Sequence, residues 1–163
     1  MLVYHPAYDS YHCLFRAAAI LEVCQRTEAE RLRVLDFCLS FPAVVAEFRL
    51  PQGRASLRKA ALQAKSPYRD PISSKSVFVN LGRIQAAAFS CLSATGLVSV
   101  ASGFIYRTEI PLPKPIKAKC EQLQNREKVF FDLLLSQLVD MPLYGPDGLK
   151  ARSGLLEYRY DTV

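Results

Sequence analysis

The sequence predicts a mainly α-helical protein with one small β-hairpin, and three observations support this fold class. Apolar residues recur at spacings of three and four along most of the 163-residue chain, as they do in amphipathic helices. Two short β-rich runs stand on either side of a small turn that contains Gly103, which is the pattern of a hairpin. Three alternating prolines between Pro111 and Pro115 then separate the hairpin from a last long helix, because proline disfavours helix in the residue before it.

The N-terminal part of the chain predicts two helices. The first runs from about Ser10 to Cys24, since Asp9 can cap it and apolar side chains follow at helical spacing. Thr27 with Glu30 three residues later is a capping-box pattern, which predicts the start of a second helix. Proline ends or kinks a helix, so we expect this second helix to stop near Pro42.

The middle of the chain predicts a short basic helix and a longer amphipathic one. The short helix covers Arg54 to Lys65, and the longer helix covers about Val77 to Ala94. Gly96 is suited to the left-handed conformation that closes the longer helix. After the hairpin, a long helix is expected from about Ile116 to Val139, and the run from Leu155 to Tyr160 is compatible with a final strand.

This order of elements is that of a winged helix-turn-helix domain, in which the helix before the hairpin is the recognition helix and the hairpin is the wing. Val77 to Ala94 would be the recognition helix, and Leu97 to Ile110 the wing. The helix Arg54 to Lys65 would support them. The sequence therefore predicts a winged-helix-like domain over residues 1–112, with the long helix and tail of residues 113–163 packed on it as one compact unit.

The formal net charge of +6 is concentrated in one stretch, in which eight bases accompany a single acid, Asp70. The eight bases are Arg49, Arg54, Arg58, Lys59, Lys65, Arg69, Lys75 and Arg83. Positive charge at suitable spacing binds the phosphate backbone of nucleic acid without reading its sequence. We therefore expect this stretch to contact a DNA backbone, with an acidic protein face or a purely solvated surface as the two alternatives.

Base-specific recognition is less well supported than backbone binding. A recognition helix presents arginine, lysine, asparagine or glutamine to base edges. Besides serines, the longer amphipathic helix offers only Asn80, Arg83 and Gln85 for this purpose, and three consecutive alanines follow.

Four aromatic residues near the N-terminus, Tyr4, Tyr8, Tyr11 and Phe15, are spaced by four, three and four positions. If the first helix begins early, they would lie along one of its faces, where they would either cap the core or form a contact patch for a partner. The set is the candidate partner-binding site, with core capping as the alternative.

Nothing in the sequence predicts catalysis, a metal or a cofactor. The only histidines, His5 and His12, stand near Asp9 and Cys13 without the paired spacing of a structural zinc site. Phosphate-loop and nucleophile-elbow motifs are absent.

The cysteines and the apolar pattern indicate where the protein works. The five cysteines are odd in number and contain no C-x-x-C pair, which indicates free thiols in a reducing compartment. With neither a signal pattern nor a long apolar run, the expected location is cytoplasmic, with no membrane contact.

The opening segment Tyr4 to Arg16, YHPAYDSYHCLFR, and the later run RIQAAAFSCLSATGLV resemble the middle components, class five, of bacterial ABC-three-component systems. The resemblance implies an accessory subunit that bridges an SMC-like ABC ATPase and an effector, often a nuclease, in defence against phage or plasmids. Lamassu is the best-known relative of such systems. The resemblance assigns no individual residue a role.

Two functions remain open from the residues alone. One is a non-catalytic adaptor subunit of such an ATPase complex, with the basic stretch near DNA. The other is a free-standing winged-helix transcriptional regulator, which would need a sequence preference that the predicted recognition helix does little to supply.

Overall fold

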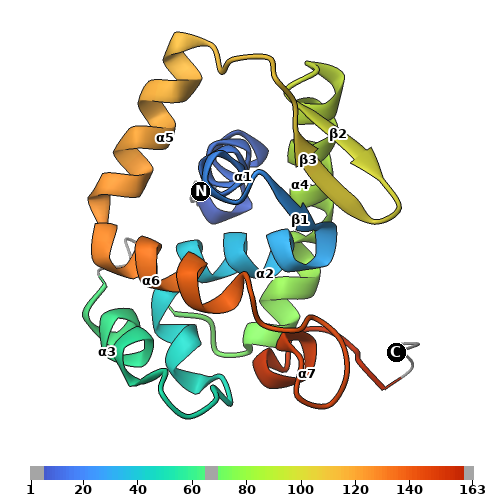
Figure 1. Ribbon diagram of the computed structural model, residues 1–163. Helices are drawn as coiled ribbons and strands as arrows, with labels where there is room; N and C mark the ends of the chain where they lie inside the picture. Colours follow the sequence, from blue (N-terminus) through green and yellow to red (C-terminus); the bar gives the residue numbers. More distant parts are fainter. Residues whose placement is uncertain (1–5, 65–69, 160–163) are drawn as a thin grey trace, which may run out of the picture.

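The computed structural model describes residues 6–64 and 70–159 and is mainly helical with one small antiparallel sheet (Figure 1). This confirms the predicted fold class, whereas the winged-helix assignment stays an interpretation of the element order. The elements are η1 (Pro6–Tyr8), α1 (Ser10–Cys24), β1 (Arg26–Glu28), α2 (Ala29–Ser40), η2 (Pro42–Glu47), α3 (Ala55–Gln63), α4 (Ser74–Ala94), β2 (Val98–Ala101), β3 (Phe104–Arg107), α5 (Lys114–Arg126), α6 (Lys128–Leu138) and α7 (Leu149–Ser153).

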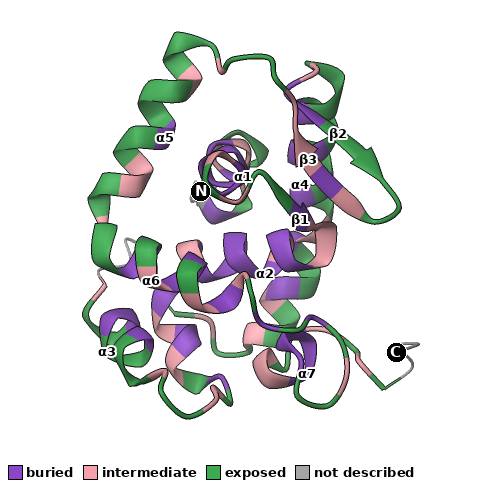
Figure 2. Ribbon diagram, viewed as in Figure 1, coloured by how far each residue is buried: buried purple, intermediate pink, exposed green. Residues whose placement is uncertain are grey.

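Helix α1 lies at the centre of the molecule, where Figure 1 views it end-on with other helices around it. Helices α2, α4 and α5 all pack against it. Its middle residues Ala17, Ala18 and Ala19 are fully buried, and their small side chains allow neighbouring helices to approach closely. Figure 2 shows the contrast in burial between α1 and the largely exposed α5.

The bounds predicted for α1 are confirmed, and local hydrogen bonds explain them. Asp9 accepts a hydrogen bond from the backbone N–H of Tyr11 at 2.8 Å, which satisfies one of the free donors of the first turn. At the other end Gln25 adopts a left-handed conformation with φ of 61°, and its N–H bonds the carbonyl of Leu21. The chain then turns directly into β1.

Aromatic side chains join α2 and α4 in the core. The rings of Phe37 and Phe78 meet edge to face with centroids 5.6 Å apart, which is a favoured aromatic geometry. The ring of Phe41 lies 5.2 Å from that of Phe37. All three side chains are almost completely buried.

The sheet has the strand order β1-β3-β2, and both pairings are antiparallel. At the hairpin tip, Ser102 and Gly103 have φ values of 51° and 79°, as the tight two-residue turns of hairpins require. The inner face of the sheet places Thr27, Val98 and Ile105 in the core. The predicted hairpin is confirmed, and β1 adds a third strand to it.

The structure corrects three details of the prediction. Thr27 does not cap α2, because it lies in β1 opposite Ile105, and Glu28 precedes the helix without a side-chain cap. The predicted long C-terminal helix is two helices, α5 and α6, since Glu127 leaves the helical conformation with φ −133° and ψ 59°. The described part of the run 155–160 forms no strand, and the short helix α7 stands before it.

Within the described residues, one helix, α4, is long and apolar enough to cross a membrane by length and composition. Its side chains Phe78, Leu81 and Leu92 belong to the core of this fold. Packing against α1 and α2 accounts for these buried side chains, whereas 28% of the apolar window as a whole is buried.

Candidate functional site

Helix α3 presents bases with no acid among them. Arg54 occupies its N-cap position, Arg58 and Lys59 follow on its exposed face, and no side chain caps the first turn. The N-terminus of a helix carries partial positive charge, so bases there are locally unfavourable. Leu57, Ala60 and Ala61 hold the opposite face in the core. A bound anion would offset the cost of this arrangement.

Two bases of the predicted stretch already form hydrogen bonds within the protein. Arg49 donates a hydrogen bond to the carbonyl of Ala151 at 3.0 Å, and Arg58 donates one to the carbonyl of Phe48 at 3.2 Å. The backbone N–H of Arg159 and, to a smaller extent, the charge of Lys75 lower the pKa of the exposed Glu157 carboxyl.

Three other bases of the stretch, Arg54, Lys59 and Arg83, have no side-chain hydrogen bond or ion pair with any described residue. Lys59 and Arg83 are exposed, and Arg54 is half-buried. The remaining two, Lys65 and Arg69, lie outside the described residues. The stretch thus does not follow one helix face, because its described members are carried by α3, α4 and the segment after η2.

The outer face of α4 carries two bases, Lys75 and Arg83, and no acid. Besides these it exposes valine, alanine and serine side chains, with Val79 61% exposed. Asn80 also lies on the surface, whereas Gln85 is buried. Of the three residues considered for base readout, Gln85 is therefore turned into the core.

The aromatic set divides between core and surface. Phe15 is only 5% exposed, while Tyr8 and Tyr11 are 44% and 58% exposed. The ring of Tyr11 meets that of Phe15 edge to face at 4.5 Å. Tyr4 lies outside the described residues. Tyr8 and Tyr11 are the members of the set that the described structure leaves accessible.

A buried polar junction, which the sequence did not predict, joins α1, α2 and α4. Arg16 Nε donates to Asp36 Oδ1 at 2.6 Å, and Gln85 Nε2 donates to Asp36 Oδ2 at 2.9 Å. Arg33 completes the set by donating to Gln85 Oε1 at 2.9 Å. Burial, reinforced by the charge of Asp36, raises the pKa of the neighbouring Cys13 thiol far above its usual range. A thiol held in this neutral form is a poor nucleophile.

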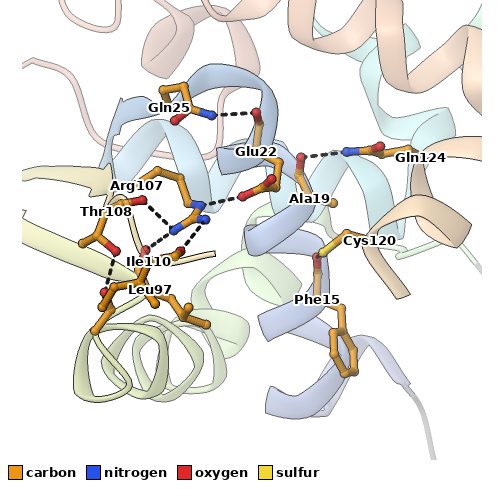
Figure 3. Close-up of polar contacts among 11 residues, drawn as sticks. Phe15, Ala19, Glu22, Gln25, Leu97, Arg107, Thr108, Ile110, Cys120 and Gln124 are labelled. Atoms are coloured by element: carbon orange, nitrogen blue, oxygen red, sulfur yellow. Dashed lines mark hydrogen bonds and ion pairs between the residues drawn. The ribbon is translucent and has the colours of Figure 1, made fainter. Parts of the chain in front are cut away.

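A second buried arginine ties the hairpin to α1 (Figure 3). Arg107 Nε lies 2.5 Å from Glu22 Oε1, and its other nitrogens donate to the carbonyls of Leu97, Thr108 and Ile110. Its side chain is 7% exposed. This arginine fixes the hairpin against the end of α1.

Figure 3 also shows how α5 is held on α1. The thiol of Cys120 lies 3.7 Å from the carbonyl of Phe15, and Gln124 Nε2 donates to the carbonyl of Ala19 at 3.3 Å. These contacts are one helical turn apart on both helices. The rest of α5 is mostly exposed.

A third buried arginine, Arg31, closes the end of α6. One nitrogen, Nη1, donates to the carbonyls of Leu138 and Met141 at 2.6 Å each, and Nε donates to Glu28 at 2.8 Å. Carbonyls at a helix end lack intrahelical hydrogen-bond partners. The Arg31 guanidinium supplies the missing donor.

The described residues contain no grouping of three or more histidine, cysteine, aspartate or glutamate side chains that could hold a metal ion. Burial raises the pKa of the Cys24 and Cys120 thiols to about 11. Asp9, considered beside His12 in the sequence, caps α1. The features that the described surface does offer are unpaired bases, apolar side chains and a sheet edge.

Comparison with known proteins settles the family. The family model described as ABC-three component (ABC-3C) system Middle Component 5 matches residues 2–161. The chain belongs to this family. No curated protein and no solved structure matches it. The match covers all the surfaces described above and confirms the resemblance seen in the opening motif. As a middle component, the protein is one part of a multi-component system, so other components of that system are its partners.

Proposed function

We propose that this middle component is a non-catalytic accessory subunit that bridges an SMC-like ABC ATPase and an effector in anti-phage or anti-plasmid defence, working in the cytoplasm with its bases beside the DNA backbone. The family match over residues 2–161 carries the accessory role.

The DNA contact is supported by bases that the protein does not use internally. Arg54, Lys59 and Arg83 have no partner among the described side chains, and the helix that begins at Arg54 has no acid in its first turn. Phosphate groups would supply the missing anions. Because Gln85 is buried, contact through the backbone is favoured over base readout by α4.

The accessory role is tested by co-expression with the ATPase and the effector encoded beside it. We expect the three chains to purify as one complex, and expect the middle component to be needed for the ATPase and the effector to remain together. A middle component that purifies alone as a monomer and binds neither subunit would contradict the proposal.

The DNA contact is tested by reversing Arg54, Lys59 and Arg83 together to glutamate in the assembled complex. We expect the affinity for a non-specific duplex to fall at least tenfold near 0.1 M salt. The slope of log affinity against log salt should flatten by ~1 for each lost phosphate contact.

A matched control reverses Lys114, Lys117 and Lys119, which are exposed bases of α5 outside the basic stretch. This variant makes the same change in net charge and should keep the wild-type salt slope. Equal slopes for all three proteins would exclude the DNA contact. A sequence motif enriched in a binding-site selection with the isolated chain would favour the transcriptional regulator instead.

A further inference from the structure

The two edges of the sheet differ in how they are protected. The edge strand β1 has only three residues, of which Arg26 and Glu28 are charged, and Arg31 holds the Glu28 carboxylate at 2.8 Å. Charged side chains and short length are devices that keep other strands from pairing with an edge. The β1 edge is therefore closed.

The opposite edge strand, β2, is also short, but it lacks the charged side chains. Its four residues include no charge and no proline, and it pairs with β3 in an unbroken register without a bulge. Ser99, Val100 and Ala101 are exposed, with Val100 56% exposed. Such an edge is a template for pairing with another strand.

The hydrogen-bond pattern shows which backbone groups of β2 face outward. Thr108 N–H reaches the carbonyl of Leu97 on the β2 side of β3, whereas Arg107 N–H reaches the carbonyl of Gln25 on the β1 side. In an antiparallel ladder the direction alternates from residue to residue. The N–H and carbonyl groups of Val98 and Val100 therefore point away from β3, and no described residue bonds to them.

Neighbouring contacts fix the backbone of β2 in an extended conformation that another strand could join. The turn at Ser102 and Gly103 is tight, and Arg107 fastens the base of the hairpin to α1 through Glu22. A strand whose backbone is already fixed loses little conformational entropy when a second strand joins it.

The side chains near the edge define the chemistry of an added strand. On the outer face, the small side chains of Ser99 and Ala101 lie opposite Tyr106 and Phe104, whose partly exposed rings stack beneath Arg26 at 5.4 and 4.0 Å. The small side chains of Ser99 and Ala101 leave room for larger apolar side chains on an added strand. Because β2 carries no charge, an uncharged segment fits it best.

We propose that the open edge of β2 binds an extended, uncharged, apolar-rich segment of another subunit of the same system, as a fourth strand. A second copy of this chain fits less well, because pairing of two four-residue strands would bury far less than the roughly 1,000 Å² that a stable dimer needs. Another subunit is favoured because the family is one component of a multi-component system. The inference rests on the accessory function proposed above.

Two substitutions at Val100 test the proposal. Val100→Pro removes an outward-facing N–H without removing a ladder bond to β3, and proline is tolerated at such edge positions. Val100→Lys places a charge at the edge and keeps the N–H. The control is Val129→Lys, which makes the same change at a valine of α6 that is 70% exposed.

The measurement is the affinity of each variant for the purified ATPase and effector subunits, together with amide hydrogen exchange at Val98 and Val100. We expect both Val100 variants to bind one subunit at least tenfold more weakly than wild type, and Val129→Lys to bind normally. The amides of Val98 and Val100 should exchange more slowly in the wild-type complex. Thermal unfolding checks that each variant is folded, and Val100→Lys keeps the test valid if the proline variant is not.

The possible failures are distinguishable. A wild-type chain that binds neither subunit would contradict the accessory function itself. Normal binding by both Val100 variants, without slowed exchange at the two valines, would overturn only the edge proposal. A wild-type dimer that Val100→Lys converts to monomers would show that a second copy occupies the edge, and would also overturn it.

Discussion

The protein uses its basic side chains in two contrasting ways. Arg16, Arg31 and Arg107 have side chains no more than 7% exposed, and each bonds a carboxylate within the chain. Arg54, Lys59 and Arg83 belong to the surface stretch and have no such partner in the described structure. A positive net charge therefore does not by itself identify an anion-binding surface. The bases that are already paired within the fold must first be subtracted.

The buried arginines connect parts of the chain that are far apart in sequence. Arg31 reaches carbonyls 107 and 110 residues away, and Arg107 reaches Glu22, 85 residues away. They act as cross-links of the fold, whereas the surface bases without a partner should tolerate substitution. Substitutions in the two sets should therefore have opposite effects on stability and on binding.

The largest effect on stability is expected from Asp36→Ala. The substitution leaves the Arg16 guanidinium buried without its carboxylate, and breaking one side of a buried ion pair costs about 3–5 kcal/mol. Urea unfolding measures the loss. The control is Asp132→Ala in the exposed Lys128–Asp132 pair, which should cost about 0–1 kcal/mol. Similar losses for the two variants would contradict the structural importance of the junction.

A smaller loss, about 2 kcal/mol, is expected from Arg31→Met, which leaves the buried carbonyls of Leu138 and Met141 without their donor. Arg83→Met is the control, because Arg83 has no such bond, and its stability should stay within about 0.5 kcal/mol of wild type.

Arg31→Met should also change how the stability of the protein depends on pH. Burial alone would raise the pKa of Glu28, but the hydrogen bonds and charge of Arg31 hold it below its usual range. A carboxyl with a lowered pKa stabilises the fold above its unfolded pKa of about 4.3 and loses that contribution as the pH falls. Unfolding measured between pH 3 and 6 should show a shallower acid decline in Arg31→Met than in wild type. Parallel curves would show that the pair does not contribute.

The smallest stability effect belongs to the triple reversal of Arg54, Lys59 and Arg83. Each surface substitution should change the free energy of unfolding by no more than about 0.5 kcal/mol, while the salt dependence of the proposed DNA binding should change strongly. A large loss of stability together with unchanged DNA binding would show that the surface bases serve the fold and not an anionic partner.

Local signals in the sequence were sufficient for most elements. The cap at Asp9 predicted the start of α1, and Gly103 predicted the hairpin turn. Gly96 has the left-handed φ of 76° expected of it. These features depend only on neighbours in the chain, which is why the helices and the hairpin could be placed.

The features that were missed depend on distant partners. The strand β1 has three residues with two charges and no apolar pattern, and it exists because β3 pairs with it. The burial of Arg16 and Gln85 requires Asp36 between them, on another helix. The break at Glu127 had a visible signal, since this residue interrupted the apolar stripe of the predicted helix.

The central position of α1 affects how the chain is made. This helix is synthesised before the helices that pack on it, yet two of the groups that cover it, Cys120 and Gln124, belong to a helix synthesised about 105 residues later. Contacts of such separation form late, because a long loop must close first. A growing chain therefore leaves the α5-facing side of this apolar helix uncovered until α5 has left the ribosome, so premature termination between the hairpin and α5 should produce fragments that aggregate or are degraded.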